Sequence, residues 1–467
     1  MVGAMIHKEF LEKLISFRFF LATALCVVVL PGVVYVRARE YASRALSYPK
    51  TVDSYRQDVR MLPREFSWAI FGRTLARPLS PLGVVAEPAD LRDGGAVELM
   101  WRDVPKHSRS ADGNPLPRLF PTLDVVAFVA IIMSLLAIAF SFDSVCGERQ
   151  LGTLKLTFAN AVPRATILVG KWAGGMAALA LPVLIGGLLS ALVLTMTMSG
   201  HLTPAHWLEI LVILLLSLLY LSVTYTAGML VSCFTASPPA SAAWLLLLWA
   251  VAFLAYPNLA PVGAAWLAPA PGRKAYEEEV QARHGEVFQR TYQEWQKFVE
   301  ENPNIEREDN AGWWISQRER YRDEMTLFAE QVGTLHEEYA RKLDQQVGVA
   351  SNLLRVTPLG SYVLAAREVS GTGPTERANV LAAIARYRSA FFIYFANRSV
   401  EMFKTRKAQG LPQVPPYTPG DFPVFEYQET TVRGRLSRSL LDGALLIAWS
   451  VVFFLASYMR FLRYDVS

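Results

Sequence analysis

Long apolar stretches that are almost free of charge alternate with strongly polar segments along this chain. A run of about 18 or more apolar residues is long enough to cross the hydrocarbon core of a membrane as a helix. The pattern therefore predicts a polytopic membrane protein with six membrane-spanning helices. We expect these helices at about residues 19–36, 124–142, 172–198, 207–233, 242–256 and 440–462.

The residues before the first span have a helical pattern of their own. Between Ile6 and Ile15, apolar residues recur at intervals of three and four, and charged residues occupy positions between them. Such a pattern is typical of a helix that lies along the membrane surface. We therefore expect residues 1–36 to form an interfacial helix and the first span, with a kink at Pro31.

Two polar segments are too long to be simple connecting loops. The first, residues 37–120, contains many prolines and glycines, and we expect it to form a small extracytoplasmic unit of helices and strands. The second, residues 258–438, opens with two amphipathic patterns separated by a loop, which predicts an antiparallel helical hairpin. The expected fold is mainly α, with a helix-rich extracytoplasmic domain that contains some β structure.

The remaining boundaries follow from these segments. Residues 121–257 hold the second to fifth spans and a polar loop at 143–171, and residues 439–467 hold the sixth span and a short tail. Pro257 should end the fifth span, because proline lacks the backbone donor that a helix needs. Further prolines follow it, and we expect a short segment there that dips back into the membrane face.

Composition and charge agree with a membrane location. Hydrophobic residues make up 52% of the chain and charged residues 19%, and the net charge is +5. A modest positive charge is typical of basic residues beside a membrane rather than of a nucleic-acid surface. Lys and Arg occur in the N-terminal segment, the loop after the second span and the tail. With six spans, the positive-inside rule places these segments, and so both termini, in the cytoplasm of a multi-pass plasma (inner) membrane protein.

No catalytic, cofactor or metal site is indicated. The Gly170-Lys171 pair lacks both the earlier glycine and the following Ser or Thr of a phosphate-binding loop. The sparse cysteines and histidines have no metal-ligand spacing. Asp124 and Asp442 lie near the ends of spans, where each could serve transport or form a buried structural salt bridge.

The polar loop after the second span contains the most informative motif of the chain. From Gly147 to Leu154, charged residues and two glycines form a short connection between apolar segments. The charges keep such a loop out of lipid, and the glycines allow sharp turns of the backbone. A loop of this kind is exposed at one membrane face, where a soluble partner can contact and push the protein.

The sequence around this loop resembles that of the ABC-2 type transporter permeases. It is most similar to the branch with a large extracytoplasmic domain before the last span, which includes the nitrous-oxide-reductase maturation and gliding-machinery permeases. Weaker similarities to this branch occur at Arg77-Pro78 and at Thr357-Pro358. The main matching residues are Leu123-Asp124, Ser134 to Ala137, Asp143, Gly147 to Arg149, Gly152 to Leu156, Asn160, Arg164 and Gly170 to Trp172.

The resemblance implies the permease subunit of an ATP-driven transporter, most often an exporter. Two permeases would pair as a homodimer or as a heterodimer with a similar permease, and separate ABC ATPase subunits would bind ATP and Mg. Coupling to the ATPase would belong to the loop residues Asp143, Gly147, Glu148, Arg149, Gly152, Thr153 and Leu154.

Other residues have expected structural or gating roles. Pro31 and Pro257 would give compliance to spans that line a pathway between subunits, with Asp124 and Asp442 near the ends of their spans. The outer domain would gate the exit or contact an extracytoplasmic protein. Two alternatives remain: a membrane subunit that transmits force to such a partner without moving a substrate, and a membrane-bound enzyme.

Overall fold

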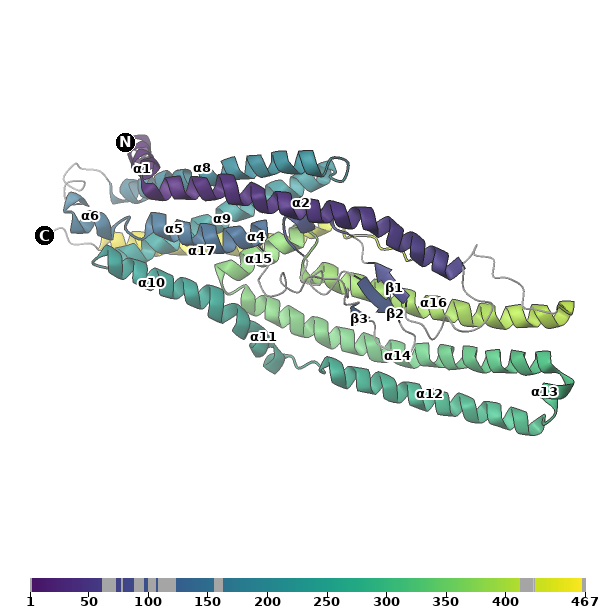
Figure 1. Cartoon of the computed structure of the whole chain (residues 1–467). Helices are drawn as coiled ribbons and strands as arrows, with labels where there is room; N and C mark the ends of the chain where they lie inside the picture. The colour runs from purple at the N-terminus through teal and green to yellow at the C-terminus, as the bar shows by residue number, and fades with distance from the viewer. Residues whose placement is uncertain are drawn as a thin grey trace.

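The computed structural model describes residues 2–60, 73–76, 79–87, 96–99, 106–107, 123–154, 163–411, 423 and 425–463. The molecule is elongated, with a bundle of helices at one end and further long helices projecting from it (Figure 1). The N-terminal helix α1, the short helix α6 and the C-terminal end of α17 lie together at the free end of the bundle, which we call the α6 end. The opposite end of the bundle, from which the long helices project, is called the hairpin end.

Six helical stretches in the described part of the chain are long and apolar enough to cross a membrane. Their elements are α2 (Phe17–Arg60), α4 (Val125–Phe128) with the π-helical turn η4 (Val129–Met133) and α5 (Ser134–Ser141), α8 (Arg164–Thr197), α9 (Pro204–Phe234), α10 (Pro238–Ala250) with the π-helical turn η5 (Val251–Ala255) and α11 (Tyr256–Leu267), and α17 (Val432–Leu462). The predicted mainly α fold with six candidate spans is thus confirmed.

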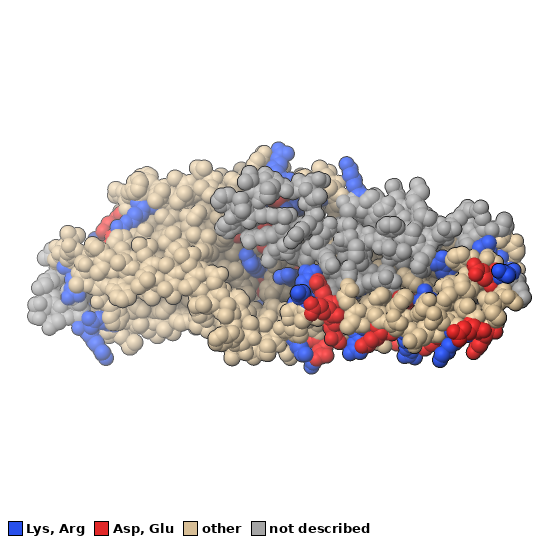
Figure 2. Space-filling model, turned by 60° about the horizontal axis from the view of Figure 1, so that its bottom comes forward, with Lys and Arg blue, Asp and Glu red and all other residues tan. Residues whose placement is uncertain are grey.

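The spans pack closely because small residues lie where two helices cross. A Cβ atom built on Gly186 of α8 would collide with the backbone of Cys26 in α2, and one built on Gly228 of α9 would collide with Ser141 in α5. Such close approach is how helices associate in lipid, where apolar surface alone gives no preference for a protein neighbour. Figure 2 shows a broad uncharged surface over the bundle, with charged residues gathered mostly over the projecting helices.

Two spans extend further than the sequence indicated. Helix α2 does not end near residue 36 but continues through Pro31 and Pro49 to Arg60, so the first part of the segment 37–120 is helical. The fifth span passes through Pro257 and ends at Leu267, which includes the stretch expected to dip back into the membrane. Pro257 is tolerated because it lies in the first turn of α11, next to a π-helical turn whose hydrogen bonds are already shifted.

The projecting part contains the expected antiparallel hairpin. It consists of α12 (Arg273–Glu301) and α14 (Asn310–Leu354), joined through the short α13 (Ile305–Glu308), and α16 (Pro374–Gln409) lies alongside them (Figure 1). Their facing apolar residues form one core, which includes Val280, Phe328 and Phe391. The hairpin therefore has its own hydrophobic core, separate from that of the bundle.

A small antiparallel sheet packs on this core. Its strands β1 (Arg73–Ala76), β2 (Ala96–Leu99) and β3 (Lys106–His107) are in the order β1-β2-β3, and Leu75 and Val97 reach the helices. The sheet is the β structure expected in residues 37–120, about half of which lie outside the described residues. Arg77-Pro78 and residues 155–162 of the polar loop also lie outside them.

A short helix, α15 (Pro358–Val369), ties the hairpin to the bundle. Nine of its residues are buried, and the helix packs mainly against α9 and α17. The ring of Tyr362 stacks on that of Tyr220 in α9 at a centroid distance of 4.7 Å, and its hydroxyl lies 2.9 Å from Oγ of Ser217. Helix α14 leads directly into α15, so the long hairpin is anchored within the hairpin end of the bundle.

The hairpin contains a histidine whose ionisation is linked to folding. Burial, together with the positive charge of Arg388 on α16, lowers the pKa of His336 below its ordinary value of 6.5, although the neighbouring Glu337 opposes this. Nδ1 of His336 lies 3.0 Å from the hydroxyl of Tyr276 on α12. The folded state therefore favours the neutral ring, and the unfolded chain takes up a proton at a higher pH.

We predict that the unfolding temperature of the hairpin falls as the pH is lowered through about 6.5, and stops falling below the folded pKa. His336→Gln keeps an acceptor for Tyr276 but does not titrate, so its unfolding temperature should depend less on pH. Circular dichroism of both purified proteins between neutral and mildly acid pH measures the difference. Identical pH profiles for the two proteins would contradict the assignment.

Candidate functional site

The polar segment after the second span folds as a short helix rather than an open loop. Helix α6 (Cys146–Gln150) follows α5 after a short turn. The backbone N–H groups of Val145 and Cys146 donate to Oγ of Ser232 in α9 at 3.0 and 3.1 Å. Gly152 then turns the chain with a φ of +75°, a value that favours glycine. The helix is thus fixed to a span that follows it by more than eighty residues.

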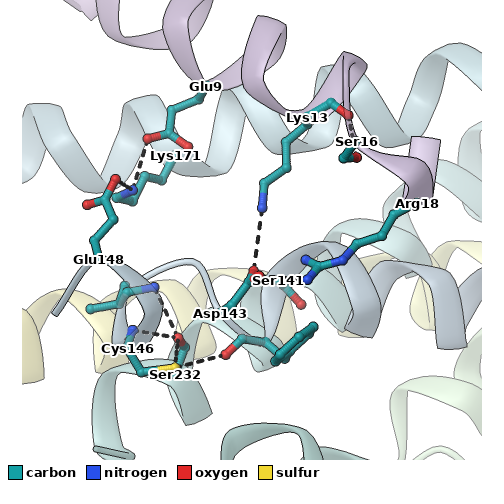
Figure 3. A network of polar contacts seen from close by, with 12 residues as sticks. Glu9, Lys13, Ser16, Arg18, Ser141, Asp143, Cys146, Glu148, Lys171 and Ser232 are labelled. Atoms are coloured by element: carbon teal, nitrogen blue, oxygen red, sulfur yellow. Dashed lines mark hydrogen bonds and ion pairs between the residues drawn. The ribbon is translucent and has the colours of Figure 1, made fainter. Parts of the chain in front are cut away.

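A buried lysine joins α6 to two other helices (Figure 3). Lys171 of α8 is only 2% exposed, and its Nζ lies 2.7 Å from Oε1 of Glu148 in α6 and 2.9 Å from Oε1 of Glu9 in α1 (Val2–Leu14). An ammonium group buried in this way is retained only when it is paired and hydrogen-bonded. The three side chains, which we call the Lys171 triad, therefore hold α1, α6 and α8 together.

A second set of ion pairs reaches the same region from the start of α2. Asp143, two residues after the end of α5, lies 2.8 Å from a guanidinium nitrogen of Arg18 and 3.6 Å from Nζ of Lys13. The guanidinium group of Arg18 also covers the ring of Phe142 at 4.6 Å. Asp143 therefore connects the α1–α2 corner to the end of the second span.

Glycines on α8 allow α1 to lie directly on it. A Cβ atom on Gly170 would come within 2.9 Å of Cβ of Met5, and one on Gly174 within 2.7 Å of Cβ of Glu9. This close approach brings the carboxylate of Glu9 to Lys171. The predicted interfacial helix is thus observed as a helix, packed on α8 by one face.

The opposite side of the α6 segment faces outward. Leu151 is 78% exposed, and Arg149, Gly152 and Thr153 are exposed beside it, whereas Leu154 is buried. Leu151 is thus an exposed apolar side chain among polar neighbours at the α6 end. The arrangement can transmit a displacement, since an object that presses on α6 also presses on α1, α5, α8 and α9. In the described part of the chain there is no group of His, Cys, Asp or Glu that could hold a metal ion.

The comparison with known protein families agrees with this architecture. The profile described as ABC-2 family transporter protein matches residues 4–466, which is nearly the whole chain. The chain belongs to the ABC-2 transporter family. It is therefore a multi-pass membrane protein of the ABC permease type, a class whose membrane subunits work with ABC ATPase subunits. A search of the curated proteins found no match.

Within this ABC-2 protein, Asp124 and Asp442 occupy structural positions at the hairpin end of the bundle. Oδ1 of Asp124 caps α4 by accepting from the N–H of Ala127, and Oδ2 accepts from the N–H of Glu87 at 3.0 Å. Asp442, fully buried in α17, forms an ion pair with Arg355 at 2.7 Å. Of the two aspartates, Asp442 thus forms a buried salt bridge, and Asp124 serves as a helix cap.

The prolines singled out from the sequence do not lie at the candidate site. Pro31 lies inside α2, and Pro257 lies in the first turn of α11. Neither interrupts its helix, so the structure gives no break at either position. The expectation that Pro31 and Pro257 make their spans more compliant is therefore separate from the Lys171 triad.

Sequence reasoning located α6 but missed most of its contacts. The sequence predicts that Glu9 lies on the polar face of an interfacial helix, because its neighbours are charged. Its burial depends on Gly170 and Gly174, which lie more than 160 residues further along the chain. The small-residue spacing Gly170-x-x-x-Gly174 was the one available signal for a helix contact. Ser232 had no signal in its local sequence.

Removing the lysine should destabilise the protein. In Lys171→Met, Glu9 and Glu148 remain as two buried carboxylates without a cation, and the loss should be about 3–5 kcal/mol. The triple variant Glu9→Gln/Lys171→Met/Glu148→Gln should recover much of it, since no buried charge remains. Thermal unfolding of the purified proteins in lipid nanodiscs measures these differences.

Lys274→Met is the matched control for this series. Lys274 is exposed and lies 3.9 Å from Glu278, so its replacement should change the stability by less than about 0.5 kcal/mol. Equal unfolding temperatures for Lys171→Met and Lys274→Met would show that the triad contributes nothing to the fold.

Proposed function

We propose that this chain is the permease subunit of an ATP-driven exporter and that α6 receives the force from a separate ABC ATPase. The observation that carries the proposal is the fixed attachment of α6 to three other helices through Glu148–Lys171–Glu9 and Ser232. Because these bonds are buried, movement of α6 is passed to the spans rather than lost in a flexible loop. ATP and Mg would be bound by the ATPase and not by this chain.

The ATPase would contact the exposed side of α6 and its flanks. Leu151 offers an apolar side chain for a groove in the partner, and Arg149 lies two residues before it. Glu148 points the other way, to Lys171, so its role is to connect α6 to the bundle. This division refines the expectation from sequence, in which all the loop residues shared one role.

The proposed orientation follows from the position of the basic residues. The α6 end of the bundle holds α1 with Lys13, the start of α2 with Arg18, and the end of α17 with Arg460 (Figure 1). Short basic segments favour the cytoplasmic side. The α6 end would then be cytoplasmic with both termini, and the hairpin, the sheet and α15 would be extracytoplasmic.

Dimerisation is part of the proposal because several spans are poorly covered by this chain. Only 11% of the most apolar 18-residue stretch of Pro238–Leu267 is buried within this chain. The corresponding share for Val125–Leu151 is 61%. A second copy or a similar permease would cover part of this apolar surface, and lipid would cover the rest. We place the export pathway between the two subunits, lined mainly by the first, second and fifth spans.

A second candidate function is force transmission to an extracytoplasmic protein. The feature that favours it is the unbroken α14, which runs from the hairpin tip to Arg355 and continues into the buried α15. Such a subunit would support ATP turnover without any substrate. ATP turnover that no transported compound stimulates, with the subunit interface crosslinked shut, would favour this function over export.

The docking of α6 can be tested directly. Leu151→Asp places a charge on the apolar contact, so ATP-driven transport in vesicles with the co-purified ATPase should fall by at least about tenfold. In Leu151→Cys, the thiol should crosslink to the ATPase. Cys146 is unsuitable for this purpose because its side chain is fully buried.

Val356→Asp provides the control. Val356 is 57% exposed but lies at the hairpin end, next to Arg355, so this change should leave ATPase docking intact. The proposal would be lost if Leu151→Asp transported normally, or if the cysteine at position 151 were labelled only by reagents added outside the cell.

A further inference from the structure

The hairpin contains a groove that has no part in the coupling described above. It lies between α14 and α16, has a volume of about 410 Å³, and is lined mainly by apolar residues, among them Phe328, Val332, Gly333 and Phe392. Cavities of this size and character are typical of sites for small molecules rather than for whole helices. The groove is thus a candidate ligand site in the part of the protein that projects from the bundle.

The groove is open because short side chains meet where two helices face each other. A Cβ atom built on Gly333 would have no heavy atom within 4 Å, and Ala329, Ala385 and Ser389 also line the space. Helices that pack against each other normally fill such positions. The unfilled volume along this seam therefore has room for an apolar chain that the protein does not supply itself.

The two ends of the groove differ in polarity. Helices α14 and α16 run in opposite directions, so His336 and Arg386 lie at the end near the bundle, whereas Phe328 and Phe392 lie at the end near the hairpin tip (Figure 1). Arg386 is exposed, and Arg388 and Glu337 also line the groove. With two arginines and one glutamate, the lining is positive at neutral pH when the histidine is neutral.

We propose that this groove binds a single-chain anionic amphiphile such as a fatty acid. Its apolar chain would lie along Val332 and Gly333 towards Phe328 and Phe392, and its carboxylate would accept hydrogen bonds from Arg386. An arginine beside a carboxylate forms a strong, charge-assisted contact. The assignment is independent of the proposed transport function, because binding needs neither the ATPase nor movement across the membrane.

The test uses the full chain in nanodiscs and a saturated fatty acid with a photoreactive diazirine at its methyl end. After irradiation, mass spectrometry should find the label on residues near Phe328 and Phe392, and unlabelled fatty acid should compete with it. The corresponding fatty alcohol should label the groove about tenfold less, because it lacks the charge. Labelling confined to the membrane spans would overturn the proposal.

Two glycines of the same helix give a matched pair of variants. Gly333→Leu fills the groove and should reduce labelling there by about tenfold or more. Gly348→Leu makes the same change on α14 at an exposed position where a Cβ also meets nothing within 4 Å, and it should leave the labelling unchanged. Both substitutions favour the helix, so a difference between them reports occupancy and not folding.

The charge at the end near the bundle is tested separately. Arg386→Gln should weaken binding of the fatty acid by about tenfold and leave binding of the alcohol unchanged. Equal labelling of Gly333→Leu and Gly348→Leu, or equal loss of acid and alcohol in Arg386→Gln, would show that the groove does not recognise an anionic amphiphile. Loss of transport in the Leu151→Asp variant has no bearing on these results.

Discussion

The α6 end of this protein depends on the ion pairs that the buried ammonium group of Lys171 forms. A charge removed from water is stabilised only by opposite charges held at hydrogen-bonding distance, and here those charges come from Glu9 and Glu148 on separate helices. If any one of the three helices moved away, a buried charge on the remaining helices would lose a partner. The triad therefore joins α1, the span α8 and α6 into one mechanical unit.

The hairpin end of the bundle is held by the same physics with different residues. Arg37 of α2 pairs with Glu87, Arg435 of α17 with the buried Glu209 of α9, and Arg355 with Asp442. Each pair joins segments that are far apart in sequence, and each lies beyond the apolar middle of the spans. The bundle thus has a centre where small residues let the helices pack closely, between two ends joined by ion pairs.

The spans and the hairpin could be predicted from local composition. Charge in lipid and apolar surface in water are both unfavourable, so spans and amphipathic helices have recognisable patterns of apolar and charged residues. The ends of two spans could not be predicted. Residues 37–60 of α2 lack an apolar signal, so the helix extends further than its sequence indicates. Pro257 predicts the end of the fifth span, but it is tolerated because it lies in a first turn that follows η5. The place of α6 followed from local charge. The hydrogen bonds between the start of α6 and Ser232, and the burial of α15, depend on tertiary packing and have no signal in the local sequence.

Helix α14 also has a geometric consequence. Its 45 residues give it a length of about 67 Å, and its root is clamped by Arg355 and α15. Rotating such a rod by about 5° at its root sweeps the far tip through about 6 Å, roughly one helical turn. A small displacement around Tyr362, at the base of α14, would therefore produce a much larger displacement of the hairpin tip.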